Sequence, residues 1–168
     1  TWGVVGSSTT NGWNGPDMPF YKTSSANVFV AYVDLTVGEI KFRENNDWAN
    51  NYGDDGADGS LEPGGANIAI STAGTYKITF DVTNLNYTVE TYSWGLVGSA
   101  TTNGWNGPDM NLTYDSYSDS WKAIVTLADG DIKIRQNNDW AVNYGDDGAD
   151  GSLEPGGANI AVSAGNYL

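Results

Sequence analysis

The feature that most constrains this chain is an internal duplication. Three tryptophans recur 92 residues later, so that Trp2, Trp13 and Trp48 return as Trp94, Trp105 and Trp140. The segment Tyr52–Ala69 is repeated without change as Tyr144–Ala161, and NGWNGPDM occurs at both 11–18 and 103–110. A period this long is that of a domain repeat, not of a solenoid unit. We therefore expect two domains, 1–92 and 93–168, joined near Tyr92 by a short, stiff connection.

Each copy has the pattern of an all-β domain. Alternating or β-branched runs predict strands, in the first copy at 2–6, 28–35, 39–44, 66–71, 75–82 and 87–90. Turn residues separate these runs at short intervals, and no segment has a helical period, which favours a β-sandwich. We expect 28–35 and 39–44 to form one hairpin, and 75–82 and 87–90 to form a second.

The second copy is shorter than the first. Its last residues, 166–168, correspond to 75–77, so the counterpart of the hairpin at 78–90 is missing. A sandwich without that hairpin exposes an edge and part of its core. We therefore expect a second domain that is truncated at its C-terminal hairpin, and a natural protein that continues beyond these residues.

Composition excludes several classes of function. The chain has 7 basic and 21 acidic residues, a net charge of −14, which repels phosphate backbones and anionic membrane surfaces. Cysteine and histidine are both absent. Their absence removes Ser-His-Asp and Cys-His catalysis and every zinc site with Cys or His ligands.

The candidate site lies in the repeated segment 39–68. Lys41 and Arg43 alternate with Ile40 and Phe42, so we expect both cations to be exposed on the outer face of a strand. A polar turn with amides and aromatic rings follows. Indole faces pack against the C–H bonds of a sugar, whereas cations and amides hydrogen-bond its hydroxyls. We therefore predict one carbohydrate patch per copy: Trp13, Lys41, Arg43, Asn45, Asn46, Trp48 and Tyr52, and then Trp105, Lys133, Arg135, Asn137, Asn138, Trp140 and Tyr144.

The same residues also suit structural roles. The rings could plug the ends of the sandwich, and the cations could form ion pairs with Asp47 and Glu44. The loop Asp54–Glu62, repeated as Asp146–Glu154, is rich enough in carboxylates for calcium, although it lacks EF-hand spacing and its Asp–Gly alternation also suits tight turns. The same carboxylates could be a glycosidase pair, but a Gly-rich loop holds them loosely. We expect no enzymatic activity and no required cofactor.

Several long strings resemble a known family. WGVVGSSTTNGWNGPDM, EIKFRENNDWANNYGDDGADG, GGANIAI and AGTYKITFDV resemble the tandem domains of SusE/SusF-type surface lipoproteins, which accompany TonB-dependent glycan transporters of Bacteroidetes. The resemblance covers both copies. It implies Ig-like β-sandwich modules, a lipid anchor in the bacterial outer membrane at the cell surface, and binding of starch or maltooligosaccharide without hydrolysis.

The resemblance also implies roles for single residues. Family sites combine an aromatic platform with a nearby Lys or Arg and an Asn. The matching positions are Trp13 or Trp48 as platform, Lys41 and Arg43 as cations, and Asn45 or Asn46 as amides. The alternative is a structural spacer or a docking subunit of an uptake complex, in which the aromatic residues would anchor a protein interface.

Overall fold

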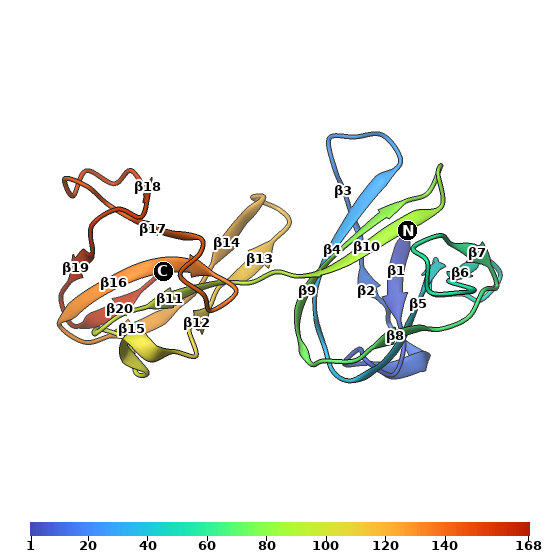
Figure 1. Ribbon diagram of the computed structural model, residues 1–168, viewed down its shortest axis with the longest axis horizontal. Coiled ribbons are helices and arrows are strands. Elements are labelled where there is room, and N and C mark those ends of the chain that lie inside the picture. The colour runs from blue at the N-terminus through green and yellow to red at the C-terminus, as the bar shows by residue number, and fades with distance from the viewer. The chain divides into compact units, whose positions relative to one another are not determined.

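The computed structural model describes all residues, Thr1–Leu168. The chain divides into two compact units, Thr1–Tyr92 and Ser93–Leu168, and both are all-β (Figure 1). Helical structure is limited to two short 3-10 segments, η1 at Gly12–Asn14 and η2 at Gly104–Asn106. No helix has the length and apolar character needed to cross a membrane.

Unit 1 consists of two antiparallel sheets. The first has the order β2-β1-β5-β6-β7, and β8 also pairs with β5. Its strands are β1 Trp2–Val5, β2 Met18–Pro19, β5 Gly38–Glu44, β6 Asn51–Gly53, β7 Glu62–Pro63 and β8 Ile68–Ile70. The second has the order β10-β9-β4-β3, with β3 Tyr21–Lys22, β4 Val28–Leu35, β9 Gly74–Asp81 and β10 Asn86–Thr91.

Alternation along these strands places every second side chain in the core between the two sheets. Val4, Ile40 and Phe42 come from the first sheet, and Ile78 and Phe80 from the second; all five are 0% exposed. The rings of Phe42 and Phe80 lie 5.3 Å apart between their centroids. This shared core confirms the predicted all-β sandwich class.

One of the two expected hairpins in unit 1 is confirmed and the other is wrong. Strands β9 and β10 pair along their length, from Tyr76 opposite Thr91 to Asp81 opposite Asn86. Strands β4 and β5 belong to different sheets and do not pair. At the corner between them, the backbone amide of Thr36 donates to the carbonyl of Ser8 at 2.9 Å, and a Cβ on Gly38 would lie 2.7 Å from the Ser7 hydroxyl. This corner packs on the loop after β1, and so the chain changes sheets there.

Unit 2 repeats the first sheet of unit 1. The order is β12-β11-β16-β17-β18, with β19 paired to β16. Its strands are β11 Trp94–Val97, β12 Met110–Asn111, β16 Gly130–Gln136, β17 Asn143–Gly145, β18 Glu154–Pro155 and β19 Ile160–Val162. The register is also repeated, because Arg135 lies opposite Gly95 as Arg43 lies opposite Gly3.

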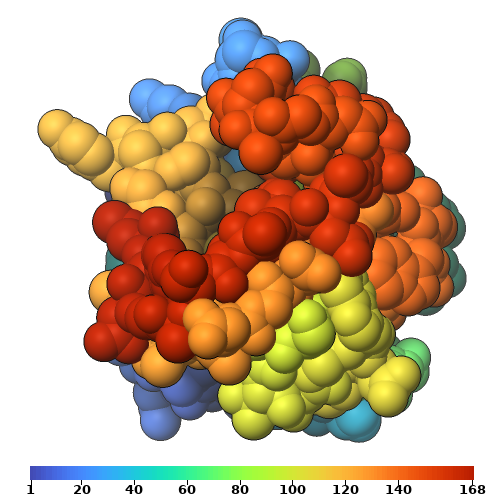
Figure 2. Space-filling model, turned by 90° about the vertical axis from the view of Figure 1, so that its left-hand side faces the viewer, coloured from blue at the N-terminus to red at the C-terminus, as the bar shows by residue number.

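The second sheet of unit 2 has fewer paired strands than that of unit 1. It contains the hairpin of β13 Thr113–Asp115 with β14 Ser120–Lys122, and the pair of β15 Val125–Leu127 with β20 Gly165–Tyr167. No residue takes the place of Ile78 or Phe80, and a cavity of about 410 Å³ opens there, lined by Leu96, Ile132, Ile134, Val162 and Trp121, among others. Trp121 is therefore only half-buried. Figure 2 shows the hollow beside β13–β14 (gold) and the C-terminal strands (red).

Candidate functional site

The candidate site lies on the outer face of the first sheet, opposite the core. Because Ile40 and Phe42 point into the core, Lys41 and Arg43 of β5 point to the outer face. Gly3 on β1 is the register partner of Arg43. A Cβ on Gly3 would lie only 2.5 Å from the Cβ of Asp17, so the missing side chain is what lets Asp17 lie over the sheet.

Asp17 holds Arg43 through a two-pronged ion pair. The Arg43 Nε donates to Oδ2 and Nη2 donates to Oδ1 of Asp17, each at 2.8 Å. Both side chains are 3% exposed. The hydrogen bond to Asp17 raises the pKa of Arg43 above its ordinary value despite desolvation, so the guanidinium stays charged. The expectation of an exposed Arg43 is thus wrong, and its partner is Asp17 and not Asp47 or Glu44.

The guanidinium supports an exposed indole. The Arg43 Cζ lies 4.5 Å from the ring centroid of Trp48, a cation–π contact. Trp13, from η1, lies beside Trp48 with ring centroids 6.0 Å apart and planes inclined by 37°. Trp48 remains 45% exposed. We call Trp13, Asp17, Lys41, Arg43 and Trp48 the Trp–Arg cluster.

Unit 2 repeats this arrangement closely. Arg135 donates twice to Asp109 at 2.7 Å, and its Cζ lies 4.7 Å from the Trp140 centroid. The Trp105 and Trp140 rings are 6.0 Å apart at 34°, and Trp140 is 44% exposed. The local sequence therefore builds the cluster twice in the same geometry.

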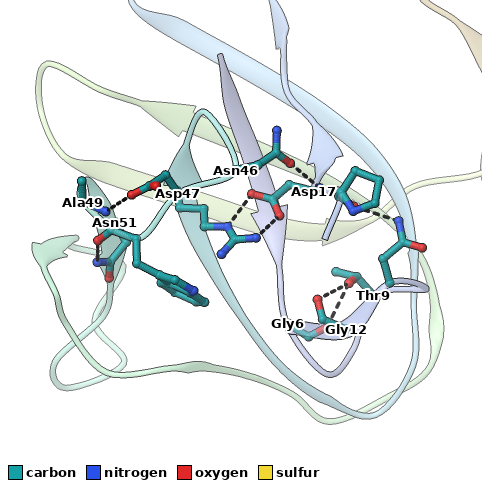
Figure 3. A network of polar contacts seen from close by, with 12 residues as sticks. Gly6, Thr9, Gly12, Asp17, Asn46, Asp47, Ala49 and Asn51 are labelled. Atoms are coloured by element: carbon teal, nitrogen blue, oxygen red, sulfur yellow. Dashed lines mark hydrogen bonds and ion pairs between the residues drawn. The ribbon is translucent and has the colours of Figure 1, made fainter. Parts of the chain in front are cut away.

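The two asparagines after β5 shape the turn that carries Trp48. Asn45 and Asn46 both have a φ of 56°, a left-handed conformation that asparagine tolerates better than most residues. The Oδ1 of Asn46 accepts from the Asp17 amide at 2.7 Å (Figure 3), and the Oδ1 of Asn45 accepts from the Thr1 ammonium at 2.6 Å. In unit 2 the Oδ1 of Asn138 accepts from the backbone amide of Asp109, and the Oδ1 of Asn137 accepts from that of Ser93. These side-chain oxygens hold the turn in place.

Lys41 differs from Arg43 in having no ion-pair partner in the cluster. It is 9% exposed, against the expectation of an exposed cation. Desolvation lowers its pKa, and the nearby charge of Asp55 opposes that shift. In unit 2, Lys133 is half-buried and its Nζ lies 6.0 Å from the Trp140 ring centroid.

Tyr52 is not brought into the cluster. It is the register partner of Phe42, so its ring faces the core, 5.6 Å from Trp2 and 6.1 Å from Phe80 between centroids. Tyr144 lies in the same way beside Trp94, at 5.9 Å. Phe42 and Arg43 are neighbours on β5 and so lie on opposite faces of the sheet. Tyr52 shares the face of its partner Phe42, and it therefore lies on the side opposite Arg43.

Two residues of the site were missed by sequence reasoning. Asp17 lies in the block NGWNGPDM, which is identical in both copies, and that identity was the available signal. Asn51 is the register partner of Arg43 on β6, and its Nδ2 donates to the Trp48 carbonyl at 2.9 Å. The Oδ1 atoms of Asn51 and Asn143 are buried without a hydrogen-bond partner. No local pattern marks this position.

The acidic loop uses its carboxylates to hold its own backbone. Asp54 is 4% exposed; desolvation raises its pKa, but hydrogen bonds from the Tyr87 hydroxyl at 2.7 Å and from loop amides outweigh that effect and lower it. Asp55 accepts from the Ala66 amide at 2.7 Å, and Glu62 accepts from the Asp55 amide at 2.8 Å. No group of three acidic side chains is arranged to hold a metal ion.

Comparisons with known proteins add one distant similarity. No protein-family model and no curated protein matches the sequence. Among solved structures, the chain is similar to SusF from Bacteroides thetaiotaomicron, with 21% identity and a TM-score of 0.40. The match covers 99% of this chain and 44% of that one, so the chain spans less than half the length of that protein. A similarity this distant carries no conclusion about function.

Proposed function

We propose that each unit binds a glycan without hydrolysing it, on a platform formed by Trp48 with Trp13 in unit 1 and by Trp140 with Trp105 in unit 2. The observation that carries this proposal is an exposed indole, fixed from below by a buried cation, that occurs twice in nearly the same geometry. Aromatic rings held side by side at the surface form a contiguous apolar patch, which is typical of an interaction site.

The arrangement suits a sugar polymer that bends. The two rings of unit 1 are inclined by 37°, so they do not form one flat surface. Successive residues of a turning α-linked glucan can each pack on one ring, whereas a flat ribbon contacts only one. Lys41 adds donors near the platform that could reach a sugar hydroxyl. We infer that the ligand is starch or a related maltooligosaccharide.

A non-catalytic role is supported by what the carboxylates do. Those of Asp54, Asp55 and Glu62 accept hydrogen bonds from the loop backbone, and Asp17 is paired with Arg43. A glycosidase needs two carboxyl groups facing the scissile bond. We expect no release of reducing ends from starch, xylan or β-glucan.

We also propose the cellular setting. The family strings resemble surface lipoproteins that serve TonB-dependent transporters, so we infer a bacterial outer-membrane protein, lipid-anchored at the cell surface. There it would hold polysaccharide near the transporter. This part of the proposal rests on the sequence resemblance alone.

Native gel electrophoresis through polysaccharide tests the binding proposal. The chain should be retarded by starch or another α-glucan, and Trp48→Ala combined with Trp140→Ala should abolish the retardation. Tyr117→Ala is a matched control, because Tyr117 is an aromatic side chain 98% exposed and outside the Trp–Arg cluster. Retardation of the double variant equal to that of the parent would reject the platform. Failure of the parent on every glycan would favour a docking subunit instead.

A further inference from the structure

Both cations on the outer face of β5 are nearly buried, Lys41 at 9% and Arg43 at 3% exposed, but only Arg43 is held in an ion pair. Arg43 uses Nε and Nη2 for Asp17, and the face of its guanidinium is covered by the Trp48 ring at 4.5 Å. Its side chain is 3% exposed. In unit 2 the side chain of Arg135 is 4% exposed and has the same contacts. A sugar therefore has almost no arginine surface to contact.

The ion pair also joins the two loops that carry the tryptophans. Asp17 belongs to the loop that contains Trp13, and its amide donates to Asn46 in the turn that contains Trp48 (Figure 3). Gly15 of the first loop is packed against the pair, since a Cβ there would lie 3.0 Å from Nη2 of Arg43. Arg43 thus contacts both the loop of one ring and the face of the other.

We propose that Arg43 and Arg135 are positioning residues and not ligand contacts. Each, with Asp17 or Asp109, fixes the angle and spacing of its two tryptophan rings, and the cationic ligand contact in each unit is Lys41 or Lys133. The inference rests on the proposed function for the lysine role. The positioning of the rings can be measured without any ligand.

Circular dichroism provides a readout of ring geometry. Two indoles whose centroids are 6.0 Å apart couple their transitions and give a paired far-ultraviolet band of opposite signs. The double variant Trp48→Phe, Trp140→Phe defines the spectrum without this coupling. Arg43→Met with Arg135→Met should reduce the band to that reference level. Lys41→Met with Lys133→Met is the matched control and should leave the band unchanged.

Binding to a maltooligosaccharide then separates the two roles. The arginine variants should bind about tenfold more weakly with the band lost, and the lysine variants should bind more weakly with the band intact. An intact band in the arginine variants would overturn the proposal, whether or not binding changed. If the arginine variants do not fold, the double variant Asp17→Asn, Asp109→Asn replaces them in the test. An intact circular-dichroism band in that variant would also overturn the proposal. If the parent binds no glycan, the proposed function fails while the band still tests the positioning.

Discussion

Trp48 is the residue on which binding should depend most directly. Its exposed face is open to a ligand, and its other face rests on Arg43. Loss of a ring-packing contact should cost about 1.4 kcal/mol, so Trp48→Ala should weaken the unit 1 site by about tenfold. Isothermal titration with a short maltooligosaccharide, in a chain whose unit 2 site is removed by Trp140→Ala, measures this. Trp48→Phe should retain part of the affinity, and a Trp48→Ala variant with unchanged affinity would show that the ring is structural.

Tyr87 and Asp54 give a stability prediction with a pH dependence. The Tyr87 hydroxyl donates to the Asp54 carboxylate, so Tyr87→Phe should cost unit 1 about 2 kcal/mol near neutral pH, as for a hydrogen bond to a charged group. Because the pKa of Asp54 is lowered from 3.8, the stability that this carboxylate contributes is present above that pH and is lost as the pH falls through the lowered value.

Urea unfolding of unit 1 at a series of pH values measures the effect. Tyr76→Phe is the control, because the Tyr76 hydroxyl donates to the neutral carbonyl of Thr72 at 2.6 Å. Its cost should be about 1 kcal/mol and should not change with pH. Equal costs for the two variants at every pH would contradict a charged Asp54.

At this scale the sequence predicted the face of a residue but not its burial. Alternation along β5 assigns Lys41 and Arg43 to the outer face. It cannot reveal that a loop 26 residues earlier in the chain brings Asp17 over that face. The placement of Tyr52 failed for a related reason, because a three-residue strand with its own register follows the turn and directs the ring to the core. Both errors concern contacts between segments, which local patterns do not specify.

At the scale of elements, the hairpin β9–β10 should decide the relative stability of the two units. In unit 1 it contributes Ile78 and Phe80, both fully buried, and unit 2 has no counterpart. Each such side chain contributes about 1.5–3 kcal/mol on burial. In hydrogen exchange of the whole chain, the amides of β16 should therefore exchange before those of β5. Phe80→Ala should lower the unfolding free energy of unit 1 by about 3–5 kcal/mol. The difference in exchange between the amides of β5 and β16 should then become smaller. Similar protection of β5 and β16 in the parent would contradict this account.

The sequence predicted where the long strands lie but not how all of them pair. Strong alternation located the long strands of unit 1 to within a residue or two, and the β9–β10 hairpin was paired correctly. The turn at Thr36–Gly38 suggested a second hairpin, but it is a corner between sheets. A short turn between two strands has the same residues in either case. The contact with Ser7 and Ser8 that decides between them is distant in sequence.

At the scale of the whole molecule, two like sites on one chain should raise the affinity for a polymer. Binding at one site raises the effective concentration of the polymer at the other. Trp48→Ala with Trp140→Ala should therefore lose more affinity for starch than the two single changes predict together. On an oligosaccharide too short to reach both sites, the effects should simply add. Additive losses on the polymer would show that the two sites act independently.

The absence of a side chain at Gly3, beneath Asp17, has a consequence for engineering this protein. A methyl group at Gly3 would collide with Asp17 at 2.5 Å, and one at Gly95 would collide with Asp109 at 2.6 Å. In a saturation library selected for binding, Gly3 and Gly95 should therefore tolerate almost no substitution, although neither can contact a ligand. In the exposed turn beside Trp48, Ala49 and Asn50 should accept many residues, whereas Asn45 and Asn46 hold the turn and should not. A designer who wants a new ligand specificity can randomise Ala49 and Asn50 and should keep both glycines and the asparagines of the turn fixed.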